Sequence, residues 1–566
     1  MRKEPILLFF LVAAMLFFFA VPLSAADGAS SGGDAPYGDV PRAPFSKGVN
    51  LSAWFEAASP SRVQFSKFTQ KDFADLKALG CDVIRLPINL KAMTSGAPDY
   101  ALDPLFLSFL DQAVGWAEDL GMYLIIDNHT FNFAVPTEGN VEAVLLKEWA
   151  QLAARYRDRS DFVVYEVLNE PHGIDCAKWA KIQGRVVAAI RAIDGRHAII
   201  VGSANFNNYR DLTALPAYPD KNLIYTFHFY DPMVFTHQGA DFTAPSLVGL
   251  SGVPFPPDAG RMPPVPARLR GTWFGESLAA YATQGSPERI GETLDGPARF
   301  ARERKVPVFC GEFGVYMPNA PREDRVAWHR LVRTALERRG LSWAIWDAYG
   351  SFGLFDLPTG GRVDEDLNVP LVEVLGLSAP PQRPRRAGPE TAAIEIYRDF
   401  PGEGISLGGE NQKGVTDYYS AAAPASGKYA LRWGGGERYS SVSFTFARAR
   451  DLSELARKGF ALEFTARTAT PGAAFEIRFR DAATAPGEKP WRMSRTVDGS
   501  LLPADGAWHR VRIPLAEMRE TGAWRDAWFE PKGEFSWERV GSLEIAAETQ
   551  PLKGVDFYFD DIEITQ

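Results

Sequence analysis

Short apolar runs alternate with helical patterns over the first two thirds of the chain. The runs are rich in β-branched and aromatic residues, which is typical of buried parallel strands. They lie at residues 48–53, 83–86, 123–127, 163–168, 198–202, 223–229, 308–312 and 342–346. Helical patterns separate them, for example at residues 71–79, 105–120, 142–156, 176–193 and 325–338. Eight strands that alternate with helices predict an α/β fold, a (β/α)8 TIM barrel rather than an open doubly wound sheet.

The C-terminal region has a different pattern. Its apolar residues alternate with polar ones, and Gly or Pro residues rather than long helices separate the runs. Examples are residues 441–446, 461–466, 475–480 and 508–513. Such alternation predicts an all-β, antiparallel β-sandwich.

Composition marks the boundaries between the regions. Residues 1–26 begin with Arg2 and Lys3, continue as an apolar stretch and end in Ser24-Ala25-Ala26, which is the pattern of a secretory signal peptide. We therefore expect a secreted protein, extracellular or periplasmic, that is free of the membrane after cleavage; an uncleaved membrane anchor is the alternative. The remaining expected segments are a flexible leader at 27–44, the barrel at 45–377, a Pro-rich linker at 378–389 and the sandwich at 390–566.

Charge and cysteine content exclude several classes of protein. The net charge of −9 argues against nucleic acid as a partner, because nucleic-acid binding needs a basic face. Neutral partners such as sugars remain open. The chain has 3 cysteines, an odd number that does not fit a disulfide framework, and none has a second ligand at metal-site spacing.

Two of the expected strands end in a glutamate. Glu170 follows the apolar run at 162–168 and precedes a proline, and Glu312 follows the run at 306–310 and precedes Phe-Gly. One acid at a strand end is more often a structural ion-pair partner. Two acids that meet over one cleft would instead form the carboxylate pair of a glycosidase.

Other polar and aromatic residues occupy the C-terminal ends of the expected strands, where TIM barrels place their active sites. They are Arg85, His129, Asn169, His228, Tyr230 and Trp346. Each one alone has a structural interpretation as a buried ion-pair partner, a hydrogen-bonded core histidine or a core aromatic. Together with the two glutamates, this ordered set resembles glycoside hydrolase family 5, the retaining cellulase and mannanase family, over residues 45–377. Thr130 departs from the pattern, since many relatives carry a second histidine or an aromatic residue there.

The resemblance implies a role for both acids and for their neighbours. Glu170 would be the acid/base, with a raised pKa that His228 helps to tune. Glu312 would be the nucleophile, kept ionised by hydrogen bonds from Tyr230 and Arg85.

The resemblance also implies sugar contacts. The Asn169 amide would bind the sugar 2-hydroxyl, Trp346 would offer a flat face to a pyranose ring, and His129 would support the site by hydrogen bonding. No cofactor is implied for catalysis. Trp54 and Trp273 are further candidates for sugar contact, with core packing as the alternative for each. The long segment at 236–275 is expected either to wall the cleft or to be a passive insertion.

The C-terminal region resembles a jelly-roll carbohydrate-binding module of the family 11-like type. The matching stretches are residues 394–400, 505–515 and 557–564. In such modules an acid near each end often holds a structural calcium ion, and Asp399 and Asp560 are the candidates here; surface acids without a metal are the alternative. Aromatic residues among Tyr418, Tyr419, Tyr439, Trp491, Trp524 and Trp528 are expected to divide between core packing and a glucan-binding face.

These observations predict a secreted, monomeric endo-β-glycanase that acts on β-glucan or a related plant polysaccharide. We favour endo-β-1,4-glucanase activity by double displacement. An endo-β-1,4-mannanase, a β-1,3-glucanase and a xyloglucanase are the enzymatic alternatives. A non-catalytic glycan-binding protein is the alternative from another class.

Overall fold

The computed structural model describes residues 40–566, apart from residues 131–134, 138, 357–359, 386–387 and 484–486. The expected signal peptide and most of the expected leader lie outside these residues. The last helix of the first region ends at Val374, and the first strand of the second region begins at Ile394. The expected linker at 378–389 falls between them.

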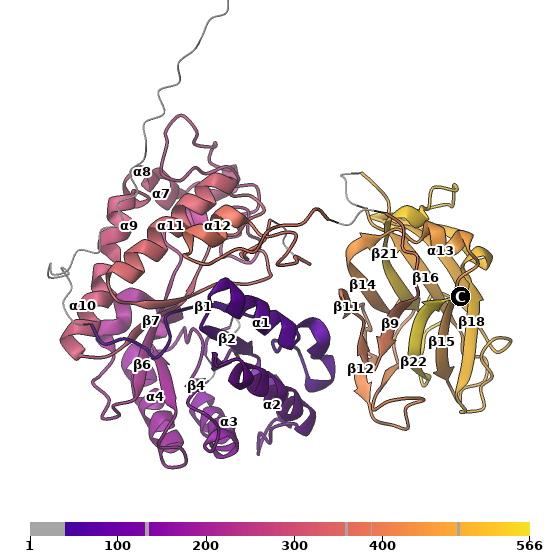
Figure 1. Ribbon diagram of the computed structural model, residues 1–566, viewed down its shortest axis with the longest axis horizontal. Helices are drawn as coiled ribbons and strands as arrows, with labels where there is room; N and C mark the ends of the chain where they lie inside the picture. The colour runs from indigo at the N-terminus through magenta and orange to yellow at the C-terminus, as the bar shows by residue number, and fades with distance from the viewer. Residues whose placement is uncertain (1–39, 131–134, 138, 357–359, 386–387, 484–486) are drawn as a thin grey trace, which may run out of the picture. The chain divides into compact units, whose positions relative to one another are not determined.

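The first region is a closed parallel barrel, as the sequence predicts (Figure 1). Among the described residues its strands pair in sequence order, and β8 closes on β1. They are β1 (Lys47–Asn50), β2 (Val83–Ile88), β3 (Tyr123–Asn128), β4 (Val163–Glu166), β5 (Ala198–Gly202), β6 (Leu223–Phe229), β7 (Val308–Phe313) and β8 (Ser342–Ile345). The longer helices around them are α1 (Gln70–Leu79), α2 (Pro104–Asp119), α3 (Val141–Tyr156), α4 (Cys176–Arg191), α10 (Asp295–Arg304) and α11 (Arg322–Arg338), and the short α12 (Val369–Val374) ends the region.

Local sequence signals set where these helices begin and end. The Asp103 carboxylate accepts the N–H groups of Leu105 and Phe106, and Pro104 occupies the first turn of α2, where its missing N–H has no cost. Thr69 and Asp72 form a reciprocal capping box at the start of α1. Gly80 ends α1 in a left-handed conformation that a side chain would disfavour.

An apolar layer fills the barrel interior near the N-terminal ends of the strands. It contains Phe45, which precedes β1, and one residue from each of β2–β8. These residues are Val83, Ile125, Val164, Ile200, Ile224, Phe309 and Ala344. Because side chains on a strand alternate with period two, the next inward residues are Arg85 on β2, Asp127 on β3 and Glu166 on β4. The polar layer thus lies directly above the apolar one, toward the C-terminal ends of the strands.

One irregularity in β7 decides which way Glu312 faces. Phe227 of β6 pairs with Cys310, but His228 pairs with Glu312, so Gly311 is an extra residue in β7. Such a bulge shifts the alternation of the strand by one residue. A Cβ atom on Gly311 would lie 2.8 Å from Thr226 Oγ1, too close for any other residue without rearrangement. The bulge turns Glu312 into the barrel, where the regular alternation would have turned it out.

The long connection after β6 is packed rather than loose. Leu247, Leu250, Val253 and Phe255 are buried, and the Gln238 side chain exchanges hydrogen bonds with the backbone of Val253. Near its start the His237 ring lies 5.0 Å from the Tyr230 ring, between centroids. The segment at 236–275 therefore contributes directly to the surroundings of Tyr230, and it is not a passive insertion.

The second region is an antiparallel β-sandwich, which confirms the predicted fold class. Its described strands form two sheets. One sheet runs β10-β9-β22-β13-β12, with β15 paired to β22 and β18 paired to β15; the other runs β11-β14-β21-β16-β17-β19-β20. The bounds are β9 (Ile394–Arg398), β10 (Phe400–Pro401), β11 (Ile405–Gly408), β12 (Val415–Ser420), β13 (Ala430–Gly434), β14 (Ser441–Arg450), β15 (Ala461–Arg467), β16 (Phe475–Asp481), β17 (Trp491–Val497), β18 (His509–Pro514), β19 (Arg519–Arg525), β20 (Ala527–Phe529), β21 (Val540–Ala546) and β22 (Asp556–Thr565).

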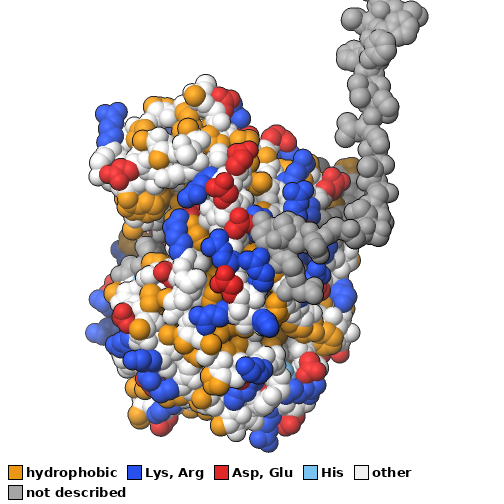
Figure 2. Space-filling model, turned by 90° about the vertical axis from the view of Figure 1, so that its left-hand side faces the viewer, with side chains coloured by type: hydrophobic (Ala, Val, Ile, Leu, Met, Phe, Trp, Pro, Cys, Tyr) orange, Lys and Arg blue, Asp and Glu red, His pale blue; other side chains and the backbone are white. Residues whose placement is uncertain are grey.

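The surface carries charges of both signs. On the face drawn in Figure 2, Lys and Arg side chains are interspersed with Asp and Glu side chains. That face lacks the continuous basic field that phosphate binding requires. Within the described residues, no helix combines the length and the apolar character needed to cross a bilayer.

Candidate active site

Arg85 lies at the centre of the polar layer and contacts three carboxylates. Its Nε and Nη2 donate to the two oxygens of Glu166 at 2.8 and 2.9 Å, and its Nη1 donates to Glu312 Oε1 at 2.8 Å. Asp127 Oδ2 lies 3.0 Å from Nη2. The Arg85 side chain is fully buried. A buried guanidinium of this kind is stable only because its donors are matched by charged acceptors.

Asn50 and Asn169 complete the shell around Arg85. Nη1 also donates to Asn50 Oδ1 at 3.0 Å, and Nη2 donates to Asn169 Oδ1 at 2.7 Å. Because the Asn169 oxygen is occupied, its amide N–H groups face the other way. The amide nitrogen lies 3.2 Å from His129 Nε2. Arg85 therefore fixes the orientation of the Asn169 amide as well as the position of Glu312.

Glu312 has a second donor. The Tyr230 hydroxyl, just beyond the end of β6, donates to Glu312 Oε2 at 2.8 Å. Burial raises the pKa of the Glu312 carboxyl above its ordinary value, while the neighbouring His228 and the charge of Arg85 oppose this shift. With one donor on each oxygen, the carboxylate is held in a single orientation.

Glu170 lies four residues beyond the end of β4 in a strained conformation. Its φ angle is 45°, in the left-handed region that side chains disfavour. Its Oε1 lies 2.6 Å from His228 Nδ1. Burial raises the pKa of Glu170 to about 7, against the opposing charges of His129 and Arg85. The carboxyl can therefore hold or release a proton near neutral pH.

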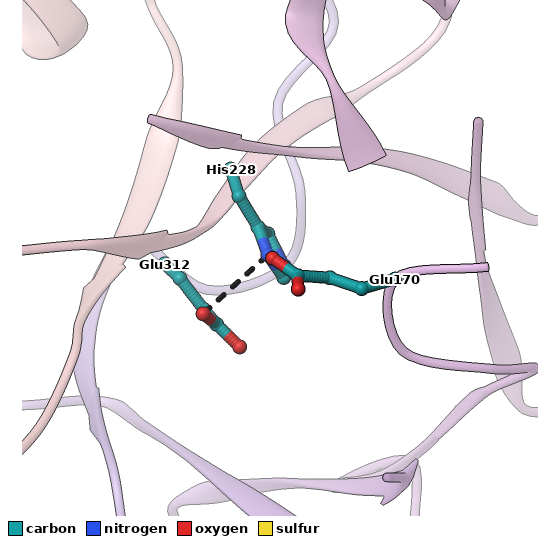
Figure 3. Close-up of side chains that lie close together, drawn as sticks. All are labelled: Glu170, His228 and Glu312. Atoms are coloured by element: carbon teal, nitrogen blue, oxygen red, sulfur yellow. Dashed lines mark hydrogen bonds and ion pairs between the residues drawn. The ribbon is translucent and has the colours of Figure 1, made fainter. Parts of the chain in front are cut away.

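His228 links the two glutamates. Its Nδ1 lies 2.6 Å from Glu170 Oε1 and 3.4 Å from Glu312 Oε2 (Figure 3). Burial lowers the pKa of His228 to about 4, so the ring is neutral at pH 7 and donates through only one nitrogen. Asn207 Nδ2 lies 3.5 Å from the other nitrogen, Nε2, which places the His228 proton on Nδ1, toward Glu170.

The separation of the two glutamates is short. One ligand atom from each of Glu170, His228 and Glu312 lies within 4.8 Å of the other two. A carboxyl pair at about 5–5.5 Å suits attack by one group on the anomeric carbon, whereas about 6.5–9.5 Å leaves room for a water molecule. The geometry here belongs to the first class.

His129 and Trp346 form one wall of the site. His129 Nδ1 lies 2.7 Å from Asp127 Oδ2, and the His129 and Trp346 rings stack with centroids 5.5 Å apart. Of the eight residues expected at the strand ends, seven are joined by hydrogen bonds or ion pairs. The eighth, Trp346, contacts them by stacking on His129.

Comparison with known proteins agrees with this arrangement. The family model described as cellulase (glycosyl hydrolase family 5) matches residues 43–351, more than half of the chain. The chain belongs to glycosyl hydrolase family 5. It is therefore a glycosyl hydrolase. A second model, carbohydrate binding domain 30, matches residues 403–566, which corrects the family 11-like type suggested by the sequence.

Curated relatives include two endoglucanases of Acetivibrio thermocellus. Endoglucanase H is 29% identical over 312 residues, which are 55% of this chain and 30% of that protein. Endoglucanase C is 27% identical over 317 residues, which are 54% of this chain and 91% of that protein. A solved structure of Thermotoga maritima Cel5A with cellobiose is 25% identical and covers 58% of this chain and 97% of that one, with a TM-score of 0.48.

The family 5 site also contains residues that the sequence analysis missed. Asp127 and Glu166 bind Arg85, Asn50 orients it, and Asn207 contacts His228. Glu166 lies in a strand that ends near Glu170, and its charge within an apolar run was a usable signal. Asn207 had no such signal, because a left-handed turn at Asn205, Phe206 and Asn207 places it.

The two extra tryptophan candidates have different outcomes. Trp54 is only 1% exposed, its ring packs against those of Phe65 and Trp116, and its Nε1 donates to a backbone carbonyl. It is a core residue, so the expectation of a sugar contact is wrong. Trp273, at the start of α7 (Trp273–Ala279), is 48% exposed and remains a prediction.

The calcium candidates act as acceptors for backbone groups. Asp399 Oδ1 accepts the N–H groups of Lys428 and Tyr429, and Asp560 Oδ2 accepts those of Ala425 and Ser426. These bonds anchor loops and occupy part of the ligand capacity of both carboxylates. Calcium binding stays a prediction.

Replacement of Arg85 by Met should destabilise the barrel strongly. It leaves three buried carboxylates without their cation, which costs about 3–5 kcal/mol of unfolding free energy. The loss should be larger at pH 7 than at pH 5, because protonation neutralises the stranded carboxylates. Denaturant titration at both pH values measures this.

Arg155→Met is the matched control, since it removes an ion pair with Asp111 on the surface and should cost at most about 1 kcal/mol. Equal losses for the two variants would contradict the central role of Arg85.

Proposed function

We propose that the protein is a secreted retaining endo-β-1,4-glucanase that works by double displacement. The observation that carries this proposal is the approach of the Glu170 and Glu312 carboxylates, bridged by the His228 imidazole. Glu312 attacks the anomeric carbon while Glu170 donates its proton to the leaving oxygen. Glu170 then removes a proton from water, and the water displaces Glu312.

The neighbours of each glutamate fit these roles. Arg85 and Tyr230 stabilise the Glu312 carboxylate before attack and again when it leaves. The raised pKa of Glu170 supplies a protonated acid near neutral pH. Once Glu170 has lost its proton, the Nδ1–H group of His228 stabilises the carboxylate. A non-catalytic glycan-binding barrel would need none of these features.

The choice of β-1,4-glucan is supported by the relatives, several of which are endoglucanases. β-1,4-Mannan, β-1,3-glucan and xyloglucan are the alternatives. Release of reducing sugar from soluble forms of each polymer decides between them. Secretion rests on the signal-peptide pattern of residues 1–26, which lie outside the described structure, and a monomer is the expected state.

We propose that the reaction needs no metal. Glu170, His228 and Glu312 are close enough to hold a cation. However, Arg85 already places a positive charge 2.8 Å from Glu312, which opposes a second cation.

The C-terminal domain is proposed to bind the polymer. Tyr418, Tyr419 and Trp491 are buried, but Trp524 and Trp528 are exposed, and they pair across β19 and β20. Arg492 lies over the Trp528 ring at 5.2 Å. Neighbouring flat rings beside hydrogen-bond donors are suited to stacking on pyranose rings.

Azide should reveal the separate roles of the two glutamates. Glu312→Ala should lose cleavage of β-glucan, and with an activated β-aryl cellobioside and azide it should form the α-glycosyl azide, because azide enters from the vacated nucleophile side. Glu170→Ala should lose about 100-fold or more on polymer, and with azide it should form the β-glycosyl azide, because Glu312 still forms the intermediate. The anomeric configuration is read by NMR. Reversed configurations would overturn the assignment.

The pH profile should follow the proton on Glu170. That carboxyl acts as an acid only while protonated, so kcat/KM on β-glucan should fall as pH rises through about 7. On the acidic side, activity should fall when Glu312 becomes protonated. In the Glu170→Gln variant, the residual kcat/KM should no longer fall as pH rises through about 7. A profile of the parent that stays flat to pH 9 would contradict the assigned acid.

The exposed tryptophan pair should control binding to insoluble polymer. The double variant Trp524→Ala/Trp528→Ala should bind insoluble cellulose at least about fivefold more weakly and keep its activity on soluble glucan. Depletion assays measure the binding. Val415→Ala, an exposed apolar position on β12 in the other sheet, is the control and should bind as the parent does.

A further inference from the structure

A cavity of about 300 Å³ lies beside the catalytic acid. Asn169 and Glu170 line it on one side, and Val144, Leu145 and Glu148 of α3 line it on another. Its volume is at the lower end of the range for ligand pockets. No step of the proposed reaction uses the α3 side of this cavity.

Glu148 has an oxygen without a partner in this cavity. Asn128 Nδ2 donates to Glu148 Oε2 at 3.0 Å, but Oε1 has no hydrogen bond within the part of the chain that the structure describes. The side chain is fully buried. Buried polar atoms almost always have a partner, so an unpaired one on a cavity wall indicates a missing ligand or water.

Thr130 sets this geometry. Its hydroxyl donates to Asn128 Oδ1 at 2.7 Å and accepts the Lys91 N–H at 3.1 Å. The Asn128 oxygen is therefore occupied, and its amide nitrogen must face Glu148. A side chain at position 130 without a group that both donates and accepts would not form this relay.

Glu148 is neutral at pH 7. Burial raises its pKa to about 8, although the Asn128 hydrogen bond and the charge of Lys91 oppose the shift. Since Oε2 accepts from Asn128, the proton resides on Oε1, where it is available for donation. The other titratable groups that line the cavity are Lys91, Glu170 and His172.

We propose that this cavity binds one neutral sugar unit of the glycan, with the Glu148 carboxyl group donating a hydrogen bond to a sugar hydroxyl. A neutral acid beside Val144 and Leu145 suits a pyranose, which offers hydroxyl groups at its edge and C–H groups on its faces. An anionic ligand would not suit it, since ionisation of either carboxyl would repel it. The inference rests on the proposed function, because Glu170 joins the cavity to the cleavage site.

The test measures binding in the Glu312→Ala background, where cellohexaose and mannohexaose stay intact. In calorimetry, adding Glu148→Leu should raise the Kd for the bound hexaose about fivefold, which corresponds to the loss of one neutral hydrogen bond. Glu148→Gln keeps a donor and should stay within twofold. Glu142→Gln removes a charge from the first turn of the same helix, where Glu142 pairs with Arg185, and should leave the Kd unchanged.

The pH dependence separates a sugar contact from a purely structural role. From pH 7 to pH 9 the Kd should rise more for the protein that retains Glu148 than for its Glu148→Gln variant, because only the glutamate loses a proton. This comparison holds even if Glu148→Leu fails to fold. Equal pH dependence for the two, or unchanged affinity in a folded Glu148→Leu variant, would show that the cavity holds water only and would overturn the inference. If neither hexaose binds to the Glu312→Ala parent, the proposed substrate class is wrong and the inference falls with it.

Discussion

The catalytic half of the barrel depends on one buried cation. Arg85 binds Asp127, Glu166 and Glu312 and holds the Asn169 amide, so one guanidinium sets the positions of groups on several different strands or strand ends. A single positive charge does not balance three acids. Together with burial, the remaining negative charge on Asp127 raises the pKa of Glu170. Arg85 itself opposes this rise in the Glu170 pKa, so burial is the main cause that prepares the acid.

The barrel separates stability from chemistry along its axis. The apolar layer built by Phe45 and one side chain from each of β2–β8 closes the interior on one side. Two residues further along β2, β3 and β4 the side chains become charged, because the period of a strand returns every second residue to the interior. The same strands therefore supply the apolar layer near their N-terminal ends and the charged layer near their C-terminal ends. The charged side chains pack directly against the apolar layer.

Much of this was visible in the sequence. Alternating strand and helix patterns predicted the barrel, period-two runs predicted the sandwich, and the order of polar residues at the strand ends predicted the network around Glu170 and Glu312. The residues that were missed depend on information that a linear pattern lacks. Glu166 could be recognised as a charge within an apolar run, but the run does not show that its side chain faces inward toward Arg85. Trp54 was misjudged because burial by Phe65 and Trp116 comes from other segments of the chain. Asn207 reaches His228 only through a left-handed turn that composition does not reveal.

The bulge at Gly311 determines whether the Glu312 side chain faces the barrel interior or the surrounding helices. If β7 paired regularly, with Gly311 opposite His228, Glu312 would turn toward the helical layer, away from Arg85 and Tyr230, while the strand itself stayed apolar and well paired. The fold would tolerate that change far better than the chemistry would. The direction of the nucleophile therefore depends on an irregularity in β7 that the pairing of the sheet does not itself require.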